Sequence, residues 1–409
     1  MLDNITHSID VLVIGGGIAA LSAALSARET GASVVLWEAS SRFLRGGNTR
    51  HSHNLRAMHE NPTSLMPGSY TTQSFISEIE KASKGTCDPE LARIFVEQSE
   101  ELPDWLSQKG IVFQTDYVPS SRKTVFFLGG GRAAVNSLYK TAETSGVDIL
   151  YDHPLEAIDI AHPDLNAKSI IICTGSAPGD PSLPFINRGT PFSRGEIMYS
   201  LFRQGIASVG SSEAGHLVAV DARYADDDGG IVTRIDGMEF GVVLDRSGKR
   251  FQDETAIKNQ TRYSTWGRLI AKQPDQYAVL ILDSEGIQKA PPYALPPICS
   301  LSLSDLALEL NMERNVFVAS VAETGRVVKE PFYALPIRPG IAFTSLGVKV
   351  DNTMRLVRKD GSSLKNIFAA GTIMGPNVLC DGYLAGAGVT VGAVFGRIAG
   401  QEAANHALT

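Results

Sequence analysis

The chain has 409 residues, 43% hydrophobic and 20% charged, so it is not a disordered chain and has ample apolar material for two or three folded domains. Its 37 basic and 44 acidic side chains give a net charge of −7, with no Lys/Arg block, which argues against binding to nucleic acid. The four cysteines are scattered and form no CxxC pair, which argues against a metal site or an iron–sulfur cluster in this chain. We expect a cytoplasmic protein, because no apolar run approaches the ~20 residues that span a bilayer and the first residues do not resemble a secretion signal.

The first predicted elements form a strand–turn–helix–strand unit. An apolar run at 10–14 predicts a buried parallel strand, residues 18–25 predict a helix of small residues, and residues 33–37 predict a second strand. Between the first strand and the helix, Gly15 to Ala20 fits the pattern G-x-G-x-x-(G/A). The pattern alone is weak evidence, but here every neighbouring element follows in order.

This unit predicts a dinucleotide site. Gly15 allows the tight turn, Gly17 lets the backbone approach a pyrophosphate, and Ala20 keeps the helix close to the strand. Phosphates are favoured at the helix N-terminus, and Glu38 at the end of the second strand accepts hydrogen bonds from ribose hydroxyls. The alternative is a glycine-rich turn in some other α/β protein.

Further elements follow in chain order. We expect helices within 75–110, at 133–145, near 264–272 and at 301–311, short strands between 217 and 283, a strand at 366–370, and a helix of small residues at 386–405. Glycine-bearing segments accompany them and are predicted to contact the cofactor: Gly46, Gly47, Asn48 and Thr49; Thr174 and Gly175 after a strand; and Gly371. A return to the nucleotide at the C-terminal end of the chain suits an extended flavin and favours FAD over NAD.

Six blocks of the sequence carry a resemblance to a known family: 46–51, 54–59, 188–191, 229–234, 262–269 and 382–386. They resemble the flavoprotein family of fumarate reductases and succinate dehydrogenases, and within it the tricarballylate dehydrogenases most of all. The resemblance implies an α/β fold with a Rossmann-like FAD-binding domain split into 1–212 and 336–409, and an inserted α+β capping domain at 213–335.

The resemblance also implies a catalytic arginine on the cap, which follows a Gly-x-Arg-Phe segment. Here that segment begins at Gly248, and Arg262 is the arginine that matches best, with Lys258 as a second candidate. Arginine is normally always protonated, so it needs a carboxylate beside it to relay protons, and Asp253 and Glu254 are candidates.

Substrate-binding positions come from the same resemblance. His216 and Thr233 match a substrate histidine and threonine of the family. Arg234 replaces the family's glutamate, which puts the usual proton path in doubt and adds positive charge for a substrate with additional carboxylates. Tyr383 and Phe343 replace an arginine and a histidine of fumarate reductases, so fumarate recognition is incomplete.

Arginine forks bind carboxylates in two places, so a pool of arginines is expected to bind such a substrate. We rank Arg262 first, followed by Arg234 and Arg268. Asn48 occupies the position at which succinate dehydrogenases carry the histidine that attaches FAD, which predicts non-covalent FAD, although His51 and His53 lie close by in the sequence.

These residues predict an FAD-dependent dehydrogenase that oxidises a carbon–carbon single bond of a small polycarboxylate, of the type tricarballylate to cis-aconitate, with hydride passing to flavin N5. Three alternatives stay open: an enoate reductase like fumarate reductase, a biosynthetic desaturase acting on another substrate such as an enone-forming ring, and an electron-transferring flavoprotein subunit. Candidate electron acceptors are a membrane iron–sulfur protein, which would bring the chain to a membrane surface, a quinone, an artificial acceptor and oxygen.

Overall fold

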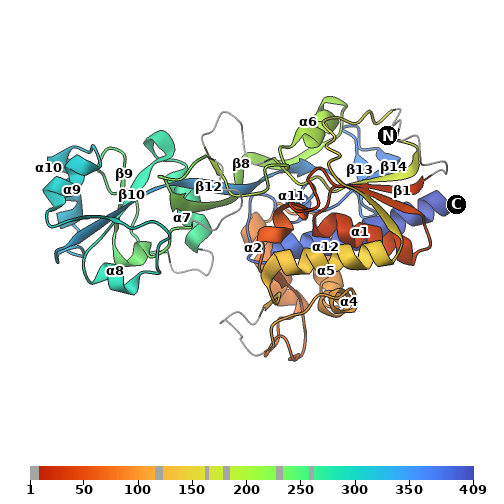
Figure 1. Cartoon of the computed structure of the whole chain (residues 1–409), viewed down its shortest axis with the longest axis horizontal. Helices are drawn as coiled ribbons and strands as arrows, with labels where there is room; N and C mark the ends of the chain where they lie inside the picture. The colour runs from red at the N-terminus through yellow and green to blue at the C-terminus, as the bar shows by residue number, and fades with distance from the viewer. Residues whose placement is uncertain (1–8, 116–122, 162–164, 178–184, 227–233, 258–261) are drawn as a thin grey trace. The chain divides into compact units, whose positions relative to one another are not determined.

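The computed structural model describes residues 9–115, 123–161, 165–177, 185–226, 234–257 and 262–409 (Figure 1). The chain divides into two compact units: unit 1 is Met1–Asp180, Gly189–Gly215 and Phe343–Thr409, and unit 2 is Pro181–Arg188 and His216–Ala342. Residues 185–188, which the sequence places in the FAD domain, belong to unit 2. The reason is that β7 (Ile186–Asn187) pairs in parallel with β12 (Phe332–Val348), at Gly340 and Ile341.

The main sheet of unit 1 has the strand order β13-β14-β6-β1-β2-β5. Its strands are β1 (Ile9–Ile14), β2 (Val34–Trp37), β5 (Val147–Leu150), β6 (Ala167–Ile172), β13 (Arg355–Val357) and β14 (Ser363–Ala369). The central strand β1 pairs in parallel with β2 and β6, and only β13 at one edge runs antiparallel. Strands from the two ends of the chain therefore share one sheet, as expected for a split Rossmann-like domain.

Unit 1 also contains helices and a small hairpin, and α1, α5 and α12 pack against the main sheet. The helices are α1 (Ile18–Glu29), α2 (Thr72–Ser83), α3 (Pro89–Gln98), α4 (Leu102–Gln108), α5 (Gly130–Thr144), α6 (Glu196–Arg203), α11 (Pro376–Leu379), α12 (Ala387–Leu408) and the 3₁₀ helix η1 (Gly47–His51). The hairpin pairs β3 (Asn54–Arg56) with β4 (Thr124–Phe126). The helical region expected at 75–110 contains three helices, and proline starts α3 and lies in the first turn of α4.

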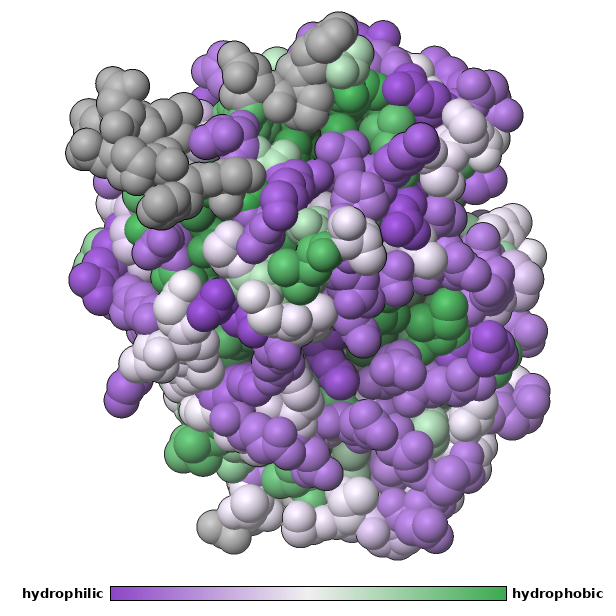
Figure 2. Space-filling view, turned by 90° about the vertical axis from the view of Figure 1, so that its right-hand side faces the viewer, coloured by the Kyte–Doolittle hydropathy of each residue, from purple (hydrophilic) through white to green (hydrophobic). Residues whose placement is uncertain are grey.

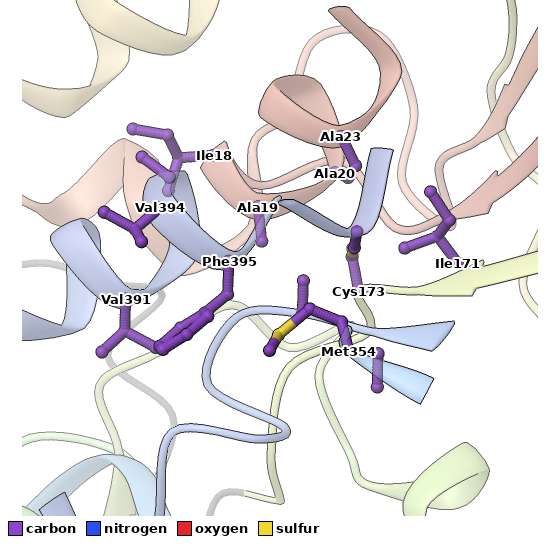
Figure 3. Packing of buried hydrophobic residues seen from close by; sticks show 14 of the residues in the cluster. Ile18, Ala19, Ala20, Ala23, Ile171, Cys173, Met354, Val391, Val394 and Phe395 are labelled. Carbon is purple, nitrogen blue, oxygen red and sulfur yellow. The ribbon is translucent and has the colours of Figure 1, made fainter. Parts of the chain in front are cut away.

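Helix α12 packs closely against α1, the helix that follows the glycine turn (Figure 3). A Cβ atom at Gly396 would lie 2.4 Å from the Ala19 carbonyl oxygen, and one at Gly400 would lie 2.2 Å from that of Ala23. Only glycine permits this approach, so the small residues of the C-terminal helix fix the position of α1.

The sheet of unit 2 has the order β11-β12-β10-β9, and β7 and β8 also pair with β12. Strand β8 (Ser208–Asp221) begins in unit 1 and continues into unit 2. The other elements of unit 2 are η2 (Met238–Phe240), β9 (Val242–Asp245), α7 (Arg262–Ile270), η3 (Pro274–Gln276), β10 (Ala278–Leu282), α8 (Gly286–Lys289), β11 (Ile298–Ser300), α9 (Leu303–Glu309) and α10 (Arg314–Ala322). Strand β10 is antiparallel to both β9 and β12.

Both faces of this second sheet are buried. Along β10, Val279 and Ile281 join an apolar cluster with α9 and α10, and the alternate residues join a second cluster that contains Trp266 of α7. Side chains alternate between the faces of a strand, so an all-apolar strand requires cover on both sides. The fold class expected from the sequence, a Rossmann-like FAD domain with an inserted α+β cap, is confirmed.

Hydrophilic residues cover most of the face shown in Figure 2, with scattered hydrophobic residues among them. Of the helices in the described part of the chain, none combines the length and the apolar character needed to cross a bilayer.

Candidate active site

The glycine turn after β1 is held against β6. Gly15 has φ +122°, and a Cβ atom there would lie 2.3 Å from the carbonyl oxygen of Cys173, so this position requires glycine. The Thr49 Oγ1 atom accepts a hydrogen bond of 3.0 Å from the backbone N–H of Ile18, the first residue of α1. This hydrogen bond joins the glycine turn after β1 to the segment 46–49, the two loops that are expected to hold a pyrophosphate.

Glu38 directly follows β2 and is buried. Its Oε1 atom accepts a 2.9 Å hydrogen bond from the backbone N–H of Ser40, and its Oε2 atom lies 3.0 Å from the Tyr139 hydroxyl. Burial and, next, the nearby Glu38 charge raise the pKa of Tyr139 well above its usual value, so the phenol stays neutral and can donate to the carboxylate. Sequence reasoning missed Tyr139, which lies on α5 and far from Glu38 in the chain.

One cavity of unit 1 brings together most of the predicted cofactor residues. Those that line it are Gly15, Gly17, Glu38, Gly47, Asn48, Thr49, Thr174, Gly175 and Gly371. Ala20 and Gly46 do not line it. Ala20 is fully buried where α1 packs on the sheet, and the Gly46 N–H lies 3.4 Å from Glu38 Oε2. Residues that the sequence did not indicate also line the cavity, among them Trp37, His153, Leu155, Thr190 and Ser193.

Two observations show that this cavity fits FAD. The Trp37 side chain is 6% exposed, and its Nε1–H has no hydrogen-bond partner among the described residues, so a buried donor in the lining awaits an acceptor. The glycine turn and the start of α1 also line the cavity, which is the arrangement that accepts a pyrophosphate. Gly15, Gly17, Asn48 and Thr49 would hold the phosphates, and Glu38 would hold the ribose.

A second cavity of unit 1 shares Thr372 and Gly388 with the first. Phe343 and Tyr383, which replace two substrate-binding residues of fumarate reductases, both line it. The structure therefore brings these two substitutions, forty residues apart in the chain, into one place next to the nucleotide cavity. Among the residues that the structure describes, no charged side chain lines this second cavity.

Asn48 lines the nucleotide cavity, and its Oδ1 atom accepts a 2.7 Å hydrogen bond from the backbone N–H of Thr190. An amide cannot form the histidine–flavin bond of succinate dehydrogenases. We expect acid precipitation of the purified protein to release all of its yellow colour into the supernatant. Flavin that remains with the pellet, and with the peptide containing His51 and His53 after digestion, would contradict non-covalent binding.

In unit 2, His216 lies among arginines. Its Nδ1 atom is out of contact with solvent, and its ring meets that of Tyr263 edge to face at 6.1 Å. Burial and then the charges of Arg188, Arg234 and Arg268 lower the pKa of His216 to about 3, so the imidazole is neutral at pH 7. Arg234 also lies over the Tyr263 ring, 4.7 Å from its centroid. The structure thus brings three of the predicted substrate residues together, and Thr233 lies outside the described residues.

The depressed pKa of His216 gives the stability of the protein a defined pH dependence. The unfolded chain takes up this proton near pH 6.5 and the folded chain only near pH 3, so the free energy of unfolding falls as the pH drops through this window. We expect His216→Gln, which cannot take up the proton, to lose less stability between pH 6.5 and 4.5 in urea unfolding followed by circular dichroism. Parallel curves for the two proteins would contradict the assignment.

Arg262 begins α7 and is partly exposed. Its Nη2 atom lies 2.6 Å from Glu239 Oε1, and the Glu239 side chain is 22% exposed. The two relay candidates from the sequence do not pair with it. Asp253 is exposed and pairs with Arg250, and Glu254 is buried between Arg250 and Arg326. Glu239, which no sequence pattern marked, is the carboxylate that contacts Arg262, and Lys258 lies outside the described residues.

Within the described residues, no group of three or more His, Cys, Asp or Glu side chains could hold a metal ion.

Comparisons with known proteins agree with this geometry. Residues 10–391 match the family described as FAD binding domain. A probable fumarate reductase of Shewanella frigidimarina is 24% identical over 98% of this chain and 76% of its own length. The solved structure of an open flavocytochrome c3 fumarate reductase superposes with a TM-score of 0.77 at 21% identity, over 100% of this chain and 80% of that one. A 3-ketosteroid Δ1-dehydrogenase from Sterolibacterium denitrificans gives a TM-score of 0.77 at 14% identity, over 98% of this chain and 100% of that one. The chain belongs to the FAD-binding flavoprotein family of fumarate reductases and succinate dehydrogenases, and it is an FAD-dependent oxidoreductase that acts on CH–CH groups.

Proposed function

We propose that the protein dehydrogenates a carbon–carbon single bond of a polycarboxylate, converting tricarballylate to cis-aconitate. The observation that carries this proposal is the group of Arg188, Arg234 and Arg268, whose charges all act on His216. Guanidinium groups gathered near one neutral imidazole suit a substrate that carries several carboxylates, because each can bind a carboxylate in two places.

Arg268 supports the proposal most directly. It is partly buried, burial lowers its pKa, and it has no acidic partner among the described residues. A desolvated guanidinium without a counter-ion destabilises the folded protein, and a bound carboxylate removes that cost. Arg234 has Asp236 at 2.7 Å, so its charge is partly compensated.

The chemistry divides between cofactor and protein. Bound FAD supplies the acceptor, flavin N5, for a hydride from the substrate carbon. The protein has to remove the proton next to a carboxylate and stabilise the negative charge that develops there. Arg262 with Glu239 is the pair proposed for the proton, and Arg234 and Arg268 are proposed to bind the carboxylates.

An anaerobic titration tests the function. Tricarballylate is expected to bleach the flavin absorbance of the purified protein, with succinate much less effective because it has one carboxylate fewer. Arg268→Met should weaken the apparent affinity for tricarballylate roughly tenfold to hundredfold, the value of one charge-assisted hydrogen bond. Arg314→Met on α10, also in unit 2, is the matched control. No bleaching by tricarballylate would overturn the proposal.

Two alternatives each have an observation in their favour. The similarity to a probable fumarate reductase favours an enoate reductase, since the same residues serve both directions, and re-oxidation of the reduced protein by fumarate would show it. The uncharged second cavity, lined by Phe343 and Tyr383, favours a desaturase of a ring substrate, which bleaching by a cyclic ketone would show.

We further propose that electrons leave through a partner, such as a membrane iron–sulfur protein, with the chain itself cytoplasmic and bound to the membrane surface only through that partner. An electron-transferring subunit without its own substrate is the remaining alternative. Sedimentation with membranes from the native host, lost after their iron–sulfur proteins are extracted, would support the partner.

A further inference from the structure

A group of arginines lies on unit 1, outside the cavity that fits FAD. Arg42, Arg45, Arg50 and Arg132 line a cavity of their own together with Phe43 and Asn136. None of these six residues lines the nucleotide cavity. We name them the arginine pocket.

The arginine pocket has more positive charge than its neighbours neutralise. Arg42 and Arg45 share a single carboxylate, that of Glu143, at 3.3 and 3.6 Å. Arg50 and Arg132 have no acidic side chain within ion-pair distance among the described residues. Burial and then the charge of Arg132 lower the pKa of Arg50, and the charge of Glu38 offsets part of this effect. Four like charges that share so few carboxylates favour the binding of an anion.

The donors of the arginine pocket are held in place. Arg45 lies 4.2 Å from the centroid of the Tyr139 ring and donates to the Tyr151 hydroxyl at 2.6 Å. Arg50 donates to the Phe43 carbonyl oxygen at 3.2 Å, and Arg132 lies over the Phe43 ring at 5.6 Å from its centroid. Guanidinium groups fixed by stacking lose less side-chain entropy when they bind, as suits recognition of an oxyanion.

We propose that the arginine pocket binds a small multivalent oxyanion, a phosphate- or carboxylate-bearing molecule, at a site separate from the nucleotide cavity. The pocket is coupled to FAD through a short segment of chain. Arg45 and Arg50 lie on either side of 46–49, and Gly47, Asn48 and Thr49 of that segment line the nucleotide cavity. An anion that holds Arg45 and Arg50 together would steady this segment and strengthen the binding of FAD, through slower release, and FAD would raise the affinity for the anion by the same factor as the anion raises the affinity for FAD.

Titration calorimetry on the FAD-loaded protein at low salt tests the proposal, with inorganic pyrophosphate and citrate as separate probes. One saturable site is expected for at least one probe, and the tighter of the two assigns phosphate or carboxylate as the preferred anion. Arg50→Gln and Arg132→Gln should each weaken this binding about tenfold or more, and the double variant should abolish it. Arg203→Gln, an exposed arginine of unit 1, is the control and should bind like the unchanged protein.

A second measurement distinguishes an anion-binding role of these arginines from a purely structural role. Release of FAD, followed by the rise in flavin fluorescence on dilution, should be slowed by the anion in the unchanged protein and unaffected by it in Arg50→Gln. Equal binding by all variants, absence of saturation below 10 mM (about the weakest affinity that counts as a site), or an anion that displaces FAD would each overturn the proposal. None of these outcomes depends on the identity of the substrate.

Discussion

Replacing Arg262 with glutamine is expected to lower the rate of flavin reduction by about 10²- to 10⁴-fold, the usual contribution of a positioned proton-transfer group. Glutamine keeps a hydrogen-bond donor on a shorter side chain, but it has no charge and cannot pass on a proton. Arg262 contacts the Glu239 carboxylate at 2.6 Å, so a guanidinium proton can pass to Glu239 and leave a neutral guanidine that accepts the proton from the substrate. Stopped-flow absorbance at saturating tricarballylate, without oxygen, measures the effect directly.

The same helix position elsewhere in unit 2 gives a matched control. Arg314 is the first residue of α10, as Arg262 is of α7, and both are exposed. Arg314→Gln should leave the rate unchanged, so a loss confined to Arg262→Gln reports on chemistry rather than on net charge. If Arg262→Gln reduces its flavin as fast as the unchanged protein, Arg262 is not the proton-transfer residue.

Glu239→Gln distinguishes a relay from an ion pair that only positions Arg262. A relay predicts a slower rate that an added small carboxylate such as acetate partly restores, because the missing group carried a proton. A positioning role predicts a lower rate that acetate does not restore.

The fold of unit 1 could be predicted well from the sequence because the patterns that indicate it lie close together in the chain. The apolar run of β1, the glycine turn and the acid at the end of β2 lie within thirty residues, and each follows from a conformational or burial requirement. Errors of detail were local too. Helix α9 is capped by Ser302, whose Oγ accepts from the N–H groups of Ser304 and Asp305, so it begins later than residue 301.

The parts of the site that the sequence could not predict depend on contacts between distant residues. Tyr139 reaches Glu38 because α5 packs beside η1 and α1, and no spacing in the chain records that contact. Glu239 precedes the Gly-x-Arg-Phe segment in the chain, whereas the predicted relay candidates, Asp253 and Glu254, follow it. Charged residues near Arg262 in the sequence, Asp253 and Glu254, turn to Arg250 instead, because an ion pair forms with whichever partner the fold brings close.

Glu254→Gln is expected to destabilise unit 2 by about 3 kcal/mol, at the lower end of the cost of removing one partner from a buried ion pair. The Glu254 side chain is fully buried and contacts Arg250 Nη2 at 2.6 Å, Arg326 Nη1 at 3.0 Å and the backbone N–H of Val243 at 2.8 Å. Glutamine cannot neutralise the two guanidinium groups, and its NH₂ group faces donors. Both arginines retain some solvent contact, which keeps the cost from rising further.

Hydrogen exchange followed by mass spectrometry measures this effect in unit 2 alone, which matters because a chain of two units need not unfold in one step. Peptides of β9 and β10 should exchange roughly 150-fold faster in Glu254→Gln, the factor that corresponds to ~3 kcal/mol, while those of β1 and β6 keep their rate. Asp253→Asn is the control. Asp253 directly precedes Glu254 in the chain and pairs with the same Arg250 at 3.3 Å, but it is exposed, so water replaces the lost contact. Equal acceleration by both variants would mean that burial does not set the strength of this pair, and no change in either would mean that the arginines find other partners.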